Sequence, residues 1–157
     1  MYKIYIRPLA PEDAKISYKW RNDPEVWKFT GSRPDREITY DIESEWIHKA
    51  IADPTCKRFA IMVDEKYVGN IQLTNIEDDT AEFHIFIGDR FWWGKGVGRA
   101  ATEHLLTFAR QELKLKKIYL TVRKENIAAI KSYRKVPFEE LETNHDYMRM
   151  VCNLDNL

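Results

Sequence analysis

The sequence predicts an α/β (α+β) fold, a mixed and mostly antiparallel sheet of about seven strands flanked by about four helices. Segments with alternating apolar residues come before, between and after segments that carry a helical apolar stripe. Three of the strand-like segments follow one another with only short polar turns, which favours antiparallel pairing. No repeat, low-complexity tract or proline-rich linker divides the 157 residues, so one domain over residues 1–157 is expected.

The amino-terminal third predicts one strand and two helices. Residues 2–7 alternate apolar and polar side chains, as a half-buried strand does. The segment 11–13, Pro-Glu-Asp, suits the first turn of a helix that should end near Asn22. A second helix is expected over about 39–51, with a loop at 28–34 between the two. The apolar stripe of the second helix is formed by Ile42, Trp46, Ile47, Ala50 and Ile51.

The central part predicts three antiparallel strands and an amphipathic helix. The segments 59–64, 67–75 and 81–88 have the β-branched and aromatic content of strands. After a glycine-rich stretch, a helix should begin near Gly98 and end near Lys114. Its apolar stripe is formed by Ala101, Leu105, Phe108 and Ala109.

The carboxyl-terminal part predicts a strand, a helix and a hairpin. Residues 117–123 alternate in the manner of a strand, and residues 126–135 follow as a helix. The segments 138–142 and 146–153 then form a closing hairpin. The element order is therefore strand, two helices, three strands, helix, strand, helix and two strands, which predicts a mixed sheet with helices packed on it.

Composition excludes several function classes. Basic and acidic residues balance at 25 each, so no overall field favours nucleic acid or an anionic membrane as a partner. Lys3 and Arg7 interrupt the amino terminus, and no apolar run approaches the about 20 residues of a membrane span. We therefore expect a cytoplasmic protein. Cys56 and Cys152 lack metal-ligand spacing, so neither a metal site nor a disulfide framework is expected.

The most informative stretch is Gly88–Ala100, which holds four of the six glycines: Gly88, Gly94, Gly96 and Gly98. A strand, a glycine-rich turn and a helix start together make an anion site, because free backbone N–H groups and the helix dipole converge there. Lys95 and Arg99 add positive charge. The spacing fits neither a Walker loop nor a dinucleotide fingerprint. A glycine-rich turn without a ligand is the alternative interpretation.

Two motifs together carry a family resemblance. Trp-Gly-Lys-Gly-Val-Gly at 93–98, between a strand and an amphipathic helix, resembles the acyl-CoA pyrophosphate loop of the GNAT superfamily of N-acetyltransferases, most of all its RimJ/RimL-like branch. The segment 125–138 resembles the family's later segment, in which a tyrosine, here Tyr133, follows an asparagine, here Asn126, by seven residues. Two departures are Trp93 at the first loop position and Pro137 where the family has glycine.

The resemblance implies acetyl-CoA as co-substrate, no metal, and direct attack of an amine on the thioester. A backbone N–H near the end of the strand 81–88 would stabilise the oxyanion, which can contribute about 3 kcal/mol. Tyr133 would protonate the departing thiolate; a core tyrosine is the alternative. Backbone groups of Phe86, Ile87 and Gly88 would pair with the pantetheine arm like an added strand. The remaining implied cofactor-binding residues are Gly94, Lys95, Gly96, Val97, Gly98, Arg99 and Asn126.

The sequence does not identify which residue acts as the general base. Some relatives have a glutamate five residues before the asparagine, and this chain has Thr121 there. Glu82 and His84 are the nearest substitutes because they share one face of an alternating strand, and histidine titrates in the useful range. The alternative, given equal weight, is that Glu82 is a solvated or salt-bridged strand residue and that His84 is a packed one.

For the acceptor amine, the segment 20–26, Trp-Arg-Asn-Asp-Pro-Glu-Val, resembles family members that acetylate nucleotide-linked deoxysugars. Its aromatic and polar side chains suit a sugar or base, although each tryptophan taken singly more often packs a helix on the core. The expected substrate-binding residues are Trp20, Arg21, Asn22, Trp27 and Phe29.

Other acceptors and functions stay open. A protein amino terminus is the main alternative, and a non-catalytic acyl-CoA-binding module is a third. Polyamines would require an acidic groove, whereas the acidic run Asp41, Glu43 and Glu45 is interpreted as a solvated helix face. The partners considered are a small-molecule amine, a protein amino terminus and a second copy in a homodimer.

Overall fold

The structure is a computed structural model that describes the backbone of residues 1–30 and 34–157, and the side chains of 1–28 and 34–157. The helices are α1 (Ala14–Arg21), α2 (Pro24–Thr30), α3 (Tyr40–Ala52), α4 (Val97–Gln111) and α5 (Ile127–Lys135), with short 3₁₀ turns at Pro11–Asp13, Arg90–Trp92 and Leu154–Asn156. The strands are β1 (Ile4–Pro8), β2 (Lys57–Val63), β3 (Lys66–Glu77), β4 (Thr80–Ile87), β5 (Lys117–Arg123), β6 (Glu139–Thr143) and β7 (Tyr147–Asn153).

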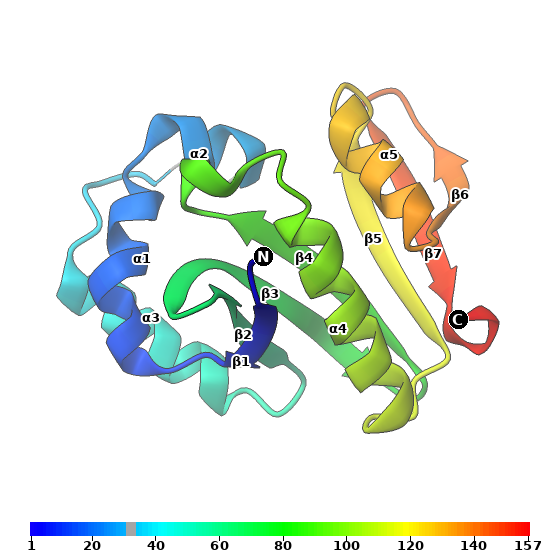
Figure 1. The fold of residues 1–157 in the computed structure, drawn as a ribbon, viewed down its shortest axis with the longest axis horizontal. Coiled ribbons are helices and arrows are strands. Elements are labelled where there is room, and N and C mark those ends of the chain that lie inside the picture. The colour runs from blue at the N-terminus through cyan, green and yellow to red at the C-terminus, as the bar shows by residue number, and fades with distance from the viewer. Residues whose placement is uncertain (31–33) are drawn as a thin grey trace.

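The seven strands form one mixed sheet in the order β1-β2-β3-β4-β5-β7-β6, which confirms the predicted fold class. Every neighbouring pair is antiparallel except β4 and β5, which run parallel because α4 connects them as a crossover. In Figure 1, α4 crosses in front of the sheet and α1, α2 and α3 gather at the β1 side, away from the β6–β7 hairpin.

Two hydrophobic clusters cover the two faces of the sheet. The larger one packs α4 and α5 on one face, through residues such as Leu105 and Ile130. The smaller one packs α1 and α3 on the other face, around Trp20, Ile47 and Tyr67. We call this second face the α1–α3 face. Side chains alternate along each strand, so the polar residues of β4, β5 and β7 that lie between apolar neighbours point to the α1–α3 face.

Strands β4 and β5 separate part of the way along their length. They pair only where Thr80–Glu82 lies beside Lys117–Tyr119, although β4 continues to Ile87 and β5 to Arg123. Figure 1 shows the two ribbons running apart above this point. Beyond Glu82, the edge of β4 that faces β5 therefore has no strand partner. This gap is the feature of the fold that positions the candidate site.

The predicted loop at 28–34 is wrong at its start, because α2 continues through Thr30. Its signals were present in the sequence: Pro24 occupies the first helical turn, and Asp23 Oδ1 accepts a hydrogen bond from the Glu25 N–H at 3.0 Å. Val26 is then buried at 3% exposure, and this tertiary contact stabilises a helix too short to form alone. Residues 31–33 of the predicted loop lie outside the described residues.

Helix α3 has the predicted bounds within one residue, but a different face is buried. Ile47 and Ala50 are buried together with Glu43, which is only 1% exposed. Trp46 and Ile51, assigned to the apolar stripe, are 39% and 42% exposed. The interpretation of Glu43 as part of a solvated face is therefore wrong. The reason is that α1 presents a hydroxyl and a guanidinium at this point, which together compensate a buried carboxylate.

No helix in the described part of the chain is long and apolar enough to cross a membrane.

Candidate active site

The glycine loop leads directly into α4. Gly96 is the residue that precedes the helix, and Gly94 and Gly96 have positive φ angles of 71° and 81°. This left-handed region favours glycine. A Cβ added at either position would meet no heavy atom within 4 Å, so the backbone is open to an approaching group. Unpaired N–H groups of the first turn of a 15-residue helix lie at the same place, which is an arrangement suited to an anion.

Gly88 has a different role from the one predicted. A Cβ there would lie 2.0 Å from Cδ2 of Trp20, so glycine is required because the indole packs on the backbone. The Gly88 N–H donates to the Val68 carbonyl oxygen at 2.8 Å and points toward β3. It is therefore not available to pair with pantetheine, and that assignment is wrong for this N–H group. Tertiary packing, which the sequence pattern does not carry, decides this position.

The end of β4 contacts the glycine loop. Gly98 lies beside Ile85, because a Cβ added to it would be 3.7 Å from Ile85 Cδ1. The Ile87 carbonyl oxygen accepts a hydrogen bond from Trp93 Nε1 at 2.7 Å. Since Gly88 N–H faces β3, strand alternation places the Ile87 and Ile85 amides toward the gap. The backbone groups of Phe86, like the Gly88 N–H, face β3, so the predicted pairing of the Phe86 backbone with pantetheine is wrong. Its ring contacts Trp20 at a centroid distance of 6.0 Å.

The two charged residues of the loop are held on the surface. Lys95 Nζ donates to the Phe91 carbonyl oxygen and lies 4.2 Å from the centroid of the Phe91 ring. Arg99 Nε pairs with Glu103 at 3.1 Å, with both side chains about half exposed. Exposed pairs of this kind contribute about 0–1 kcal/mol, so both cations can turn toward an anion at little cost.

Tyr133 lies on α5 at the α4 and α5 side of the sheet. Its ring packs edge-on against Phe83 of β4 and Phe138, with centroid distances of 6.0 and 5.8 Å. Burial raises the pKa of Tyr133 to about 12, so its hydroxyl keeps its proton at neutral pH. Within the described residues the hydroxyl has no hydrogen-bond partner, and it is not among the fully buried unpaired atoms. Asn126 caps α5, accepting from Ala129 N–H at 3.3 Å, and its role in holding the cofactor stays a prediction.

Glu82 and His84 point to the α1–α3 face as predicted, but in different environments. Both Glu82 oxygens accept hydrogen bonds from the Arg149 guanidinium, one of them at 2.8 Å, so Glu82 is held in a two-point ion pair. Arg149 also donates to Thr121 Oγ1 at 3.0 Å. His84 Nε2 lies 3.1 Å from Thr74 Oγ1. Desolvation lowers the pKa of His84, opposed by the negative charge of Glu82.

Of the expected substrate-binding residues, three are engaged within the protein. Trp20 is 8% exposed and packs on Tyr67, as the packing alternative describes. Asn22 donates to the carbonyl oxygen of Ile38 at 2.7 Å and accepts from its N–H at 2.8 Å, which joins α1 to the start of α3. Trp27 is half-buried, and the Phe29 side chain lies outside the described residues.

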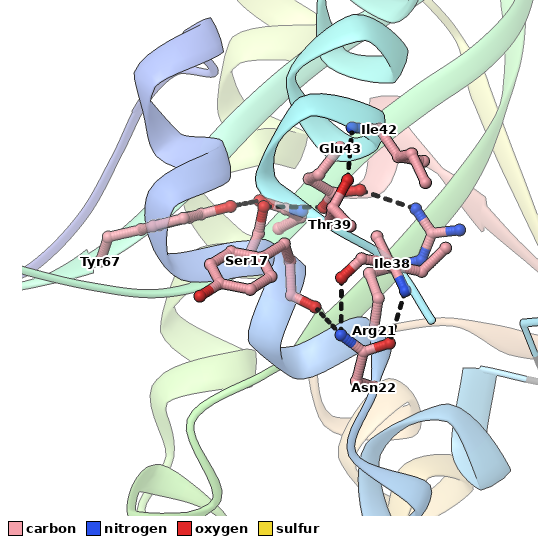
Figure 2. Close-up of polar contacts among 10 residues, drawn as sticks. Ser17, Arg21, Asn22, Ile38, Thr39, Ile42, Glu43 and Tyr67 are labelled. Carbon is pink, nitrogen blue, oxygen red and sulfur yellow. Dashed lines mark hydrogen bonds and ion pairs between the residues drawn. The ribbon is translucent and has the colours of Figure 1, made fainter. Parts of the chain in front are cut away.

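Arg21 belongs to a buried polar cluster (Figure 2). Glu43 accepts hydrogen bonds from Ser17 Oγ at 2.7 Å and from Arg21 Nη1 at 2.8 Å. The guanidinium of Arg21 also lies 5.7 Å from the Trp46 ring. Sequence reasoning missed Arg149, Trp46 and Arg58 on this face. Side-chain alternation along the strands 57–63 and 147–153 could have placed Arg58 and Arg149 on one face of the sheet. It could not have identified the residues that they contact.

Among residues 1–30 and 34–157, no group of three or more His, Cys, Asp or Glu side chains is arranged to hold a metal ion.

Comparisons with known proteins agree with this geometry. The family described as Acetyltransferase (GNAT) domain matches residues 3–139. Spermidine N(1)-acetyltransferase of Escherichia coli is 31% identical over 149 residues, covering 93% of this chain and 78% of that protein. Acetyltransferase PseH of Campylobacter jejuni is 25% identical over 144 residues, covering 92% and 87%.

Among solved structures, spermidine N-acetyltransferase from Vibrio cholerae in complex with CoA and spermine superposes with a TM-score of 0.86 at 25% identity, covering 97% of this chain and 96% of that one. The glycine loop before α4, the gap beside β4 and the family match agree. The chain therefore belongs to the GNAT acetyltransferase family and is an N-acetyltransferase that transfers the acetyl group of acetyl-CoA to an amine.

Proposed function

We propose that residues 1–157 form one acyltransferase domain that acetylates the amino group of a nucleotide-linked amino sugar. The proposed acyl-CoA site is supported by the contact between the glycine loop and the end of β4, where Gly98 lies beside Ile85. An extended acyl-CoA would pair with the free edge of β4 and rest its pyrophosphate on the loop. The binding groups would be the backbone of Ile85 and Ile87, which faces the gap, and the loop residues Gly94, Lys95, Gly96, Val97, Gly98 and Arg99.

The protonation states of Tyr133 and His84 indicate which catalytic role each side chain can take. Tyr133 keeps its proton to about pH 12, so it is suited to protonate a departing thiolate at neutral pH. His84 is the better candidate for proton acceptor, because its lowered pKa favours the neutral imidazole. Glu82 is engaged with Arg149, so its role would be to support the charge of His84 rather than to accept the proton itself. An amine attacking from the α1–α3 face would meet His84 first.

The acceptor assignment has two supports. The segment 20–26 resembles members that act on nucleotide-linked deoxysugars. The carboxylates of Glu43 and Glu82, which lie near this face, are both ion-paired with arginines and are not free to bind a polycation. A polyamine is the second candidate, because spermidine is named for the Escherichia coli and Vibrio cholerae relatives. A protein amino terminus is the remaining alternative acceptor.

Thiol release from acetyl-CoA tests the proposal. Purified protein is given nucleotide-linked amino sugars, amino-terminal peptides, spermidine and free amino acids, and CoA binding is measured in parallel by calorimetry. Release with the nucleotide-linked amino sugars alone supports the proposal. Thiol release with spermidine alone would identify a polyamine as the acceptor. Release with the peptides alone would identify a protein amino terminus. Absence of thiol release across the panel with CoA still bound would contradict all the acceptors proposed here and indicate an amine outside the panel.

Tyr133→Phe tests the proton donor. Removing the hydroxyl should lower turnover by about 10²-fold or more, while CoA affinity stays within about twofold. Tyr2→Phe is the matched control, because Tyr2 is exposed and keeps its ring contact with Trp92 without the hydroxyl. Equal turnover in both variants would remove Tyr133 from the mechanism. Membership of the RimJ/RimL-like branch, a homodimer and a cytoplasmic location stay predictions.

A further inference from the structure

Arg58 lies on the α1–α3 face, in line with the proposed proton acceptor. Arg58 of β2 pairs in register with Gln72 of β3, and Gln72 pairs with His84 of β4. Neighbouring strands are about 4.8 Å apart, so the three residues form a row about 10 Å long across the sheet. Arg58 alternates with Phe59, which packs toward α4, so its side chain is on the same side as that of His84.

The guanidinium of Arg58 has few partners: its Nη2 donates a weak hydrogen bond to Cys56 Sγ at 3.9 Å. Its Nε is buried and makes no hydrogen bond, and it is the single fully buried side-chain nitrogen or oxygen without a partner among the described residues. Within those residues, no carboxylate lies within ion-pair distance of Arg58. Asp53 influences it only at longer range and accepts hydrogen bonds from Thr55. A buried donor of this kind normally has a protein, water or ion partner.

The other arginines near this face are neutralised. Arg21 pairs with Glu43 at 2.8 Å, and Arg149 pairs with Glu82. Of Arg21, Arg58 and Arg149, Arg58 alone has no carboxylate partner among the described residues. Its guanidinium lies 5.2 Å from the Trp46 ring, which holds it in place without neutralising it.

We propose that Arg58 binds a phosphate group of the acceptor, so that the enzyme selects a phosphorylated amine over a polycation. This inference rests on the proposed function. A planar guanidinium that has no carboxylate partner among the described residues is suited to two-point binding of phosphate. A sugar ring joins the amine near His84 to the phosphate near Arg58 along the row. A polyamine, in contrast, would bring positive charge against an unpaired arginine.

Calorimetry on protein saturated with CoA tests this, because CoA then occupies the glycine loop. The probes are uridine diphosphate, thymidine diphosphate and spermidine. Wild-type protein should bind at least one nucleoside diphosphate, and Arg58→Met should weaken that binding by about tenfold or more, equivalent to about 1.4 kcal/mol. Arg58→Lys, which keeps the charge but not the planar fork, should fall between the two.

Lys57→Met is the matched control. Lys57 carries the same charge one residue away, is exposed and points to the opposite face of β2, so its loss should change nucleotide affinity by less than about twofold. CoA affinity of every variant reports whether the fold is intact.

The outcomes separate this inference from the proposed function. Absence of nucleoside diphosphate binding to wild type, or equal affinities in wild type and Arg58→Met, would overturn the role of Arg58. The same holds if spermidine alone binds and gains affinity in Arg58→Met. Acetylation of a nucleotide-linked amino sugar with unchanged KM in Arg58→Met would leave the proposed function intact and remove only the inference. Loss of CoA binding in wild type would instead remove the proposed function.

Discussion

Replacing Glu43 should destabilise the protein far more than replacing a typical helix-surface glutamate. The Glu43 side chain is 2% exposed and accepts from Ser17, itself fully buried, and from Arg21, whose side chain is 31% exposed. Glu43→Ala leaves a buried hydroxyl without its acceptor, at about 1–3 kcal/mol. It also removes a charged hydrogen bond worth about 1.5–3 kcal/mol, of which we take the lower end because Arg21 is partly solvated.

The two effects together predict a loss of about 3 kcal/mol in the free energy of unfolding, or roughly 6–12 °C in Tm for a chain of this size. Glu43→Gln should lose less, because the amide keeps the shape and one acceptor. Urea unfolding followed by tryptophan fluorescence measures both. Glu45→Ala is the control, since Glu45 is 72% exposed and its pair with Lys49 should be worth less than about 0.5 kcal/mol. Equal losses in Glu43→Ala and Glu45→Ala would refute the assignment of a buried carboxylate.

Three further predictions concern the fold around the site. Gly88→Ala should cost about 1–3 kcal/mol in urea unfolding, because its Cβ would lie 2.0 Å from the Trp20 ring, whereas Gly94→Ala, which meets no atom, should cost only about 1 kcal/mol for its positive φ. Burial raises the pKa of Tyr133 from 10.0 to about 12, so above pH 10 the unfolded chain loses this proton first. Stability should therefore fall as pH rises from 10 toward 12, and a Tyr133→Phe variant with the same slope would contradict this. The lowered pKa of His84 should make stability fall as pH drops below 6.5, and His84→Gln should flatten that limb of a Tm-against-pH curve.

Local patterns explain why most elements could be predicted. Alternation defined residues 117–123 as a strand, and β5 has those bounds. The glycine-rich turn indicated a helix start near Gly98, and α4 begins at Val97. These signals act within a few residues, so no knowledge of distant contacts is needed. The short helix α2 was missed although its start signal at Asp23 and Pro24 is equally local.

The site was predicted in part. The glycine loop, the strand before it and the spacing from Asn126 to Tyr133 lie in continuous segments, so the resemblance could indicate them. Continuous segments of sequence could not have indicated that the Trp20 side chain packs on the backbone of Gly88. Their contact joins residues 68 positions apart, and either residue alone is compatible with many environments.

By itself, the sequence determined the order of the elements apart from the short helix α2, the glycine loop and the family to which the chain is similar, because each depends on neighbouring residues. Only the tertiary structure decided which charges are neutralised on the α1–α3 face. Glu43 meets Arg21 across 22 residues, and Glu82 meets Arg149 across 67. A carboxylate or a guanidinium is stable in partial burial only when a distant segment delivers its counter-charge, and at Arg58 none of the described residues does.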